Sequence, residues 1–469
     1  MSRFPKFSAL AFPAIPARAG IASEAPERIL YSKQRFAHLD PGEERSFRLR
    51  DGTERKVRLL SVEESADSVL RLARRAEVAV EVDGRRADLE SGPYALPMEV
   101  AGLRIQADTT TAWLELPKRV QLSLWDAADP IVDAERFAFP LPGYRLFSHG
   151  MQAYNEPVHL GDRDGDPVGQ CFHHNYGVDF AGYEGREKVV SAIDGEVVQV
   201  DRGEGTLVVR DGRGASIVYG HLDSILSGIR VGSRVARGEW VGMLGRRGGS
   251  GNFSHLHVGI YLDEGERTSG RSNRHVNLYP WLVAAYRAGR GPELLAVARP
   301  HQTARVGETV VFDGTRSIPG RSPIARYEWA FEDGSRVSAP RAERAYARPG
   351  AYVAALWVED RDGRRDVDFA RVKVFSRETT EDAIPTLFAT YWPTTGVRPG
   401  DPVDFRIWPQ GGRIQGIRVD FGDGAALEGY APYSAVAHKF RAPGIYVVTV
   451  SGSSGDLRAT EKLKVVVEE

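Results

Sequence analysis

Residues 254–262, SHLHVGIYL, place His255 and His257 in alternation with Leu256 and Val258. Along a β-strand, successive side chains point to opposite faces, so both imidazoles would lie on one face and the apolar side chains on the other. The stretch therefore predicts a half-buried strand whose polar face carries two groups able to bind a metal ion or transfer a proton.

The remainder of the chain has the same β character. Short alternating runs such as EVVQV (196–200), TLVVRD (206–211) and YVVTVS (446–451) are separated by turn residues, which include 50 Gly and 27 Pro in the whole chain. This texture predicts a mainly β protein built of sandwiches or barrels. Helix signals are sparse, and the clearest is EESADSVLRLARRAEV (63–78), where we expect a helix.

Length and composition restrict the class of protein. With 469 residues, the chain is long enough for three or four domains. A formal net charge of −1, without a cluster of Lys or Arg, argues against a nucleic-acid partner. No run approaches the roughly 20 apolar residues of a transmembrane helix. The single cysteine, Cys171, excludes a disulfide within the chain. Nothing in the sequence predicts an oligomeric state.

Changes in composition and residue pattern along the chain predict the domain organisation. In the N-terminal segment, a short apolar run follows Arg3 and Lys6 and is interrupted by prolines, which fits an export signal or a disordered lead-in. We expect the protein to be secreted, periplasmic or on the cell surface. The predicted segments are the lead-in (1–29), a β-rich N-terminal module (30–128), a histidine-rich domain (129–290) and two β-sandwiches (294–376 and 386–469).

A weak internal repeat marks the last two segments. Each copy has a strand that ends in an acidic-Gly turn, and then a Pro-Gly turn that leads into an alternating strand. The two copies resemble polycystic-kidney-disease (PKD) domains, which are small Ig-like β-sandwiches, and the resemblance implies spacer or adhesion modules. It is carried by Tyr327-x-Trp329-x-Phe331-x-Asp333-Gly334, Asp420-Phe421-Gly422-Asp423-Gly424, Pro349-Gly350 and Pro443-Gly444.

Histidines are concentrated in the third segment, which contains eight of the eleven in the chain. Besides His255 and His257, His221 follows an alternating strand in IVYGHLDSI, and Asp179 ends the stretch NYGVD. Imidazoles together with a carboxylate form the donor set of open catalytic zinc sites, which have three protein ligands and a water.

This domain resembles the lysostaphin/LytM-type zinc endopeptidases, which cleave peptide cross-links in bacterial peptidoglycan. The resemblance implies an antiparallel-sheet domain with a bound zinc ion, in which Asp179 and His257 are metal ligands. It also implies that His221 and His255 are catalytic histidines beside the zinc-bound water, and that the substrate is a peptidoglycan peptide. It is carried by Gly177-Val178-Asp179, Tyr219-Gly220-His221-Leu222 and Ser254-His255-Leu256-His257.

The first ligand departs from the family pattern, which is His-x-Gly-x-Asp. Asn175 occupies the histidine position here, and His173 and His174 precede it. A bend or bulge at Gly177 would absorb one residue and redirect a side chain. We therefore expect His174 to be the third zinc ligand, with Asn175 in that role as the alternative.

The leading hypothesis is an exported zinc endopeptidase of the cell-wall type. The replacement at Asn175 keeps a second hypothesis open, in which the domain is a degenerate scaffold or regulator without zinc. A third is an adhesion protein that acts through its PKD-like domains.

Overall fold

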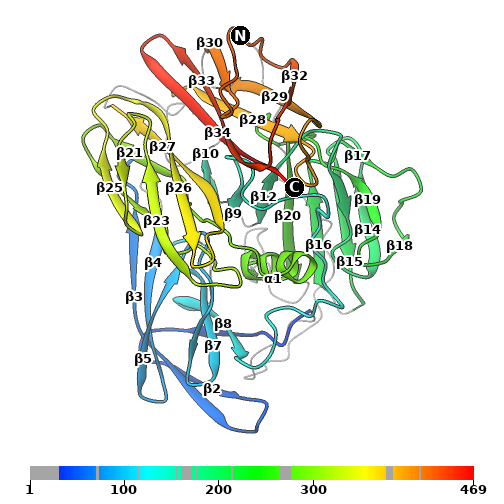
Figure 1. Cartoon of the computed structure of the whole chain (residues 1–469). Helices are drawn as coiled ribbons and strands as arrows, with labels where there is room; N and C mark the ends of the chain where they lie inside the picture. The colour runs from blue at the N-terminus through cyan, green and yellow to red at the C-terminus, as the bar shows by residue number, and fades with distance from the viewer. Residues whose placement is uncertain are drawn as a thin grey trace.

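The computed structural model describes residues 31–69, 73–113, 116–154, 156–159, 172–174, 177–212, 215–262, 276–376, 384–410 and 413–469. For residues 157–159, 172–174 and 261–262 only the backbone is described. The described residues form 34 strands and one α-helix, which confirms the predicted mainly β, multidomain class (Figure 1). None of these segments forms a helix long and apolar enough to cross a bilayer. The strand groups β1–β8, β9–β20, β21–β27 and β28–β34 fall within the four predicted segments, whose boundaries stay predictions.

The N-terminal module contains two four-stranded antiparallel sheets, in the orders β1-β8-β7-β6 and β2-β3-β4-β5. They enclose a core in which Leu39, Val57, Val80 and Ile105 are fully buried. The strands are β1 (Arg35–Leu39), β2 (Glu44–Arg48), β3 (Glu54–Ala66), β4 (Ala73–Val82), β5 (Arg85–Ser91), β6 (Met98–Val100), β7 (Leu103–Thr110) and β8 (Val120–Asp126).

The helix expected over residues 63–78 is wrong. This stretch holds the end of β3 and the first half of β4, which pair with each other as an antiparallel hairpin. In β4, Ala76, Val78, Val80 and Val82 are all fully buried, which is the period of two that a sheet requires. The core of the module therefore overrides the helix propensity of the charged residues at the hairpin end.

The central domain has a seven-stranded sheet in the order β18-β14-β15-β16-β20-β12-β9, beside a three-stranded sheet in the order β13-β19-β17. A two-stranded ribbon, β10-β11, lies outside both sheets. The strands are β9 (Ala153–Tyr154), β10 (Pro157–His159), β11 (Phe172–His174), β12 (Val178–Ala181), β13 (Lys188–Val190), β14 (Gly195–Asp201), β15 (Thr206–Arg210), β16 (Ala215–Gly220), β17 (Ser224–Ile225), β18 (Arg234–Val235), β19 (Trp240–Met243) and β20 (His255–Leu262).

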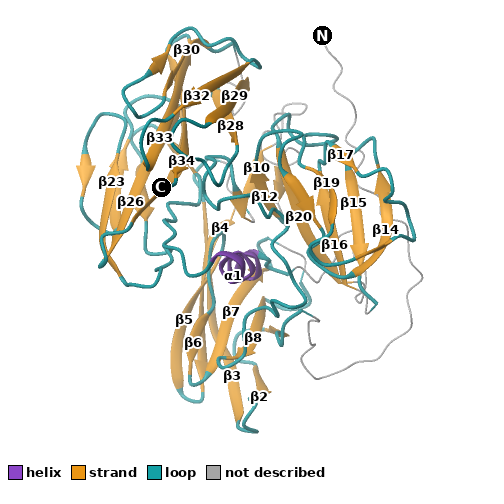
Figure 2. Cartoon of the chain, turned by 45° about the vertical axis from the view of Figure 1, so that its right-hand side comes forward, coloured by secondary structure: helices purple, strands orange, loops and turns teal. Residues whose placement is uncertain are grey.

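Strand β20 has the two-faced character that its sequence predicts. Leu256, Val258 and Ile260 are buried in the main hydrophobic core of the domain. Helix α1 (Tyr279–Arg290) packs on the same core, and its Trp281 donates a hydrogen bond of 2.8 Å to Gln34 of the N-terminal module. Figure 2 shows α1 (purple) where the module and the central domain meet.

The C-terminal part is a pair of β-sandwiches. Strands β26 and β34 pair in parallel and join the two into one nine-stranded sheet. A two-stranded sheet, β22-β25, completes the first sandwich and a three-stranded sheet, β28-β29-β32, the second. The strands are β21 (Gln302–Arg305), β22 (Thr309–Asp313), β23 (Ile324–Ala330), β24 (Arg336–Val337), β25 (Arg341–Ala345), β26 (Gly350–Asp360), β27 (Arg365–Phe375), β28 (Thr386–Trp392), β29 (Pro402–Gln410), β30 (Gln415–Asp420), β31 (Ala426–Leu427), β32 (Ala435–Lys439), β33 (Gly444–Ser454) and β34 (Leu457–Val467).

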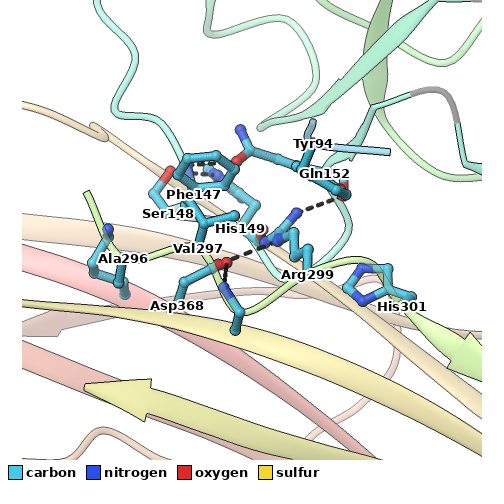
Figure 3. A network of polar contacts seen from close by, with 12 residues as sticks. Tyr94, Phe147, Ser148, His149, Gln152, Ala296, Val297, Arg299, His301 and Asp368 are labelled. Atoms are coloured by element: carbon cyan, nitrogen blue, oxygen red, sulfur yellow. Dashed lines mark hydrogen bonds and ion pairs between the residues drawn. The ribbon is translucent and has the colours of Figure 1, made fainter. Parts of the chain in front are cut away.

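A buried arginine connects the first sandwich to the central domain (Figure 3). The guanidinium of Arg299 is fully buried and donates to Asp368 of β27 at 3.2 Å, to the His149 carbonyl at 2.6 Å and to the Gln152 carbonyl. Asp368 also accepts from the Ala298 amide at 2.8 Å. The buried charge of Arg299 therefore has partners on both sides of the junction, so its burial is compensated.

Candidate active site

Strand β20 lies between β12 and β16 and brings together four of the predicted site residues. Pairing with β12 sets Asp179 directly opposite His257. Pairing with β16 sets Gly220 on the other side of His257, and His221 follows Gly220 directly. His255 projects from the same face of β20 as His257.

The Asp179 carboxylate contacts two of these imidazoles. Its Oδ1 atom accepts a hydrogen bond of 2.8 Å from Nδ1 of His257 and lies 3.8 Å from Nε2 of His255. The side chains of Asp179 and His255 are only 8% and 3% exposed, whereas 20% of the His257 side chain is exposed. The cluster is therefore buried around the carboxylate and accessible at His257.

The Asp179 carboxylate is ionised at neutral pH. Burial alone would raise the pKa of Asp179, but the attraction of the His255 imidazole when that ring is protonated at low pH and the hydrogen bond from His257 outweigh burial and hold the pKa well below its usual range. A carboxylate that stays charged in a buried position is suited to binding a cation.

His221 and His255 are held in the same tautomer. Nδ1 of His221 lies 2.8 Å from the Arg247 carbonyl, and Nδ1 of His255 lies 3.0 Å from the Phe253 carbonyl. Because a carbonyl oxygen only accepts, each Nδ1 carries the proton and each Nε2 keeps its lone pair. The two rings are 4.5 Å apart between centroids. Burial lowers the pKa of His255 and lowers that of His221 to about 3, so both rings are neutral at pH 7.

His221 has an unusual backbone conformation. Its φ of 63° lies in the left-handed region, which is uncommon for a residue with a side chain. Such a conformation costs free energy and persists only where the surrounding structure imposes it. Here it directs the ring towards His255, at the point where β16 ends.

Gly177 is required for space. A Cβ atom there would lie 2.5 Å from the Val258 carbonyl oxygen and 2.6 Å from Cε1 of His257. Strand β12 pairs with β20 without a register shift. The sequence predicted that Gly177 provides a bend; it lies at a bend just before β12, and the reason for glycine is that the chain passes against the His257 ring.

For His174, the expected third zinc ligand, the structure describes the backbone and not the side chain. His174 is the last residue of β11 and pairs with Pro157, but its side chain and that of His173 are outside the described residues, as are all of Cys171, Asn175 and residue 176. Among the residues that the structure describes, no three His, Cys, Asp or Glu side chains form a metal-binding group. The assignment of His174, and of Asn175 as its alternative, stays a prediction.

Phe253 was not identified from the sequence. Its ring stacks on His255 with the centroids 4.0 Å apart and the planes 13° from parallel. No local signal marks it, because its role depends on a contact made by folding. His149 is a core residue: it is fully buried and stacks on Tyr144 and Tyr391 at 5.5 and 4.8 Å.

Comparisons with known proteins agree with this organisation. Residues 173–269 match the family model of Peptidase family M23, and residues 292–374 and 389–467 match models of the PKD domain. A curated relative, collagenase ColA of Clostridium perfringens (strain 13 / Type A), is 27% identical over 131 residues, which are 28% of this chain and 10% of the collagenase. The match thus spans about a tenth of that relative.

Solved structures of similar chains include three peptidases. A putative glycyl-glycine endopeptidase LytM from Ruminococcus gnavus is 26% identical, with 33% of this chain and 62% of that chain covered and a TM-score of 0.24. The catalytic domain of the prophage-encoded M23 protein EnpA from Enterococcus faecalis is 25% identical, with 26% and 85% covered and a TM-score of 0.19. A zinc-containing peptidase from Vibrio cholerae is 18% identical, with 46% and 84% covered and a TM-score of 0.21.

Proposed function

We propose that this chain, which carries a family M23 peptidase domain followed by two PKD domains, is an exported zinc-dependent endopeptidase that cleaves cross-linking peptides of the bacterial cell wall. The observation that carries the proposal is the cluster on β20. A charged carboxylate contacts His257, and two neutral histidines in a matched tautomer stand beside them.

The donors in this cluster fit a zinc ion. Asp179 Oδ1 and His257 Nδ1 lie next to each other, and carboxylate oxygen and deprotonated imidazole nitrogen are both ordinary zinc ligands, so a bound zinc ion would take the place of the proton that Nδ1 donates to Asp179. His174 would complete a set of three protein ligands, with Asn175 as the alternative. A zinc ion held there would supply a coordinated water with a pKa near 7 and would polarise the scissile carbonyl.

His255 and His221 would move the protons of the reaction. Each presents an unprotonated Nε2, held in place because its Nδ1–H donates to a backbone carbonyl. One ring can accept the proton of the attacking water, and that proton can then be given to the departing amine. A protonated imidazole beside the scissile carbonyl would also stabilise the negative charge that develops on its oxygen.

The ligand assignment is tested by the zinc content of the purified full-length protein. We expect about one zinc per chain in the parent and a large loss in His174→Ala. His173→Ala is the matched control and should keep the parental content. If His174→Ala keeps its zinc and Asn175→Ala loses it, Asn175 is the ligand.

The degenerate-scaffold hypothesis has one observation in its favour, which is Asn175 at the position where the family has histidine. In that case the domain would bind peptide without hydrolysing it. A parent protein without stoichiometric zinc after purification in zinc-containing buffer would support this alternative and contradict the enzyme.

A further inference from the structure

The second PKD domain has a sheet whose two faces are both buried. In β28, Leu387, Ala389 and Tyr391 face the core of their own sandwich. The alternate residues, which should face solvent in an isolated sandwich, are also buried: Thr386, Phe388 and Thr390 are 3%, 5% and 2% exposed. The outer face of this sheet is therefore covered by other parts of the chain: Phe253 of the peptidase domain stacks on Phe388, and the guanidinium of Arg371 in the first PKD domain lies 5.8 Å from the centre of the same ring. Figures 1 and 2 show β28 and β29 beside the peptidase domain.

One contact of this face is with the loop that leads into the catalytic strand. Residues 244–254 connect β19 to β20 and end directly before His255. The ring of Phe388 stacks on Phe253 of this loop at 5.2 Å, with the planes 7° from parallel. The side-chain amide of Gln410, at the end of β29, donates to the Gly251 carbonyl at 3.2 Å.

The other contact is with the turn that follows β12, the strand of Asp179. The guanidinium of Arg406 in β29 lies 3.4 Å from the Glu184 carboxylate and 4.9 Å from the centre of the Tyr183 ring. Arg246 of the first loop pairs with the same carboxylate at 3.1 Å. The two segments next to the catalytic strands are thus tied to each other and to one sheet of the PKD domain.

Phe253 transmits this contact to His255. Its ring lies flat against the imidazole at 4.0 Å, and its carbonyl accepts the Nδ1–H of the same residue. His255, Phe253 and Phe388 therefore form a run of three nearly parallel rings that crosses the domain boundary.

We propose that the second PKD domain is part of the active site, with Phe388 as a positioning residue that fixes the plane of His255 through Phe253. This inference rests on the proposed peptidase function. Without the Phe388 ring, Phe253 loses its partner and His255 loses the wall that fixes its orientation. Since a proton-transfer group misplaced by about 1 Å can lower a rate by about 100-fold, the effect should fall on kcat.

The test uses the full-length protein with Phe388→Leu, which removes the ring, and Phe388→Tyr, which keeps it. Trp392→Leu is the matched control, because the Trp392 ring contacts the peptidase domain at Arg186, 5.3 Å away in the turn that follows β12, and is not one of the three stacked rings. Cleavage of a cross-linking peptide should show a tenfold to hundredfold loss of kcat in Phe388→Leu with KM within twofold. Phe388→Tyr and Trp392→Leu should stay within threefold of the parent in kcat.

A second readout does not depend on catalysis. Proton and nitrogen resonances of ¹⁵N-labelled histidine report the tautomer of each imidazole and its ring-current environment. The His255 signals should move in Phe388→Leu and stay in Trp392→Leu. Parental kcat and unmoved His255 signals in Phe388→Leu would overturn the inference. A different outcome is that neither the parent nor any variant cleaves peptide, although the His255 signals move as described. In that case the proposed function fails and the positioning contact stands.

Discussion

Replacing Gly177 by alanine tests how closely the chain must approach the catalytic histidine. A Cβ atom at this position would lie 2.5 Å from the Val258 carbonyl oxygen and 2.6 Å from Cε1 of His257. Carbon atoms in contact are separated by about 3.5–4.0 Å, so β12 and β20 must separate by about 1 Å to accept the methyl group. The expected effect is steric, because the methyl group would meet the Val258 carbonyl and the His257 ring.

We expect two consequences of Gly177→Ala. Overpacking should lower the free energy of unfolding by about 1–3 kcal/mol. Displacement of His257 relative to Asp179 by about 1 Å should lower kcat/KM by about 100-fold and weaken zinc retention. The assays are urea denaturation, peptide cleavage and zinc analysis of the full-length protein.

Gly228→Ala is the control for this experiment, since a Cβ atom there meets no other atom within 4 Å. It should match the parent in activity and be equal to it or slightly more stable. The steric reasoning is refuted if Gly177→Ala and Gly228→Ala have the same stability and the same kcat/KM.

Three further predictions concern other parts of the chain. Burial raises the pKa of the Asp108 carboxyl from its ordinary value to about 7, so the folded protein retains a proton that the unfolded chain releases, and stability should fall as the pH rises from about 4 to about 7. In Asp108→Asn, the decrease in the free energy of unfolding between about pH 4 and pH 7 should be smaller by on the order of 4 kcal/mol, and the melting temperature at pH 8 should be higher. Equal melting curves for parent and variant at pH 8 would contradict this prediction. Arg299→Met should destabilise the protein by about 3–5 kcal/mol in urea denaturation, because it leaves Asp368 buried without its partner, and the double variant with Asp368→Leu should recover most of the loss. Gly245→Ala should lower both the stability of the protein and its rate of peptide cleavage. A Cβ atom there would lie 2.2 Å from the Asp223 amide nitrogen, and Gly245 forms a backbone bridge with His255. Unchanged thermal unfolding would argue against this prediction.

Part of the cluster could be predicted from local signals, which mark His255 and His257, whereas the roles of Asp179 and His221 were predicted from the motifs of the family resemblance. The alternation around His255 and His257 defines one face of a strand, and pairing with β12 and β16 then sets Asp179 and Gly220 beside His257. Local patterns also gave the two sandwiches, whose Asp-Gly and Pro-Gly turns recur at matching places. These features depend on neighbours in the sequence and on the period of the strand.

Other features depend on contacts that form only in the folded chain. Residues 63–78 have helix-forming charges, but the buried valines of β4 place them in a hairpin. The stack of Phe388 on Phe253 joins segments from two domains. The sequence carried a signal that the outer face is covered: β28 reads TLFATYW and has no charged residue on either face. The identity of the covering segment could not be read from that pattern.

Hydrolysis of purified peptidoglycan tests the central claim most directly. Release of new amino groups is measured with the zinc-loaded parent protein and with His255→Ala, which keeps the Asp179–His257 pair and removes one of the two proton-transferring rings. We expect release of amino groups by the parent and a loss of at least 100-fold in His255→Ala, at equal zinc content. Absence of release by the zinc-loaded parent, or equal release by both proteins, would contradict the assignment of this cluster as a peptidase active site.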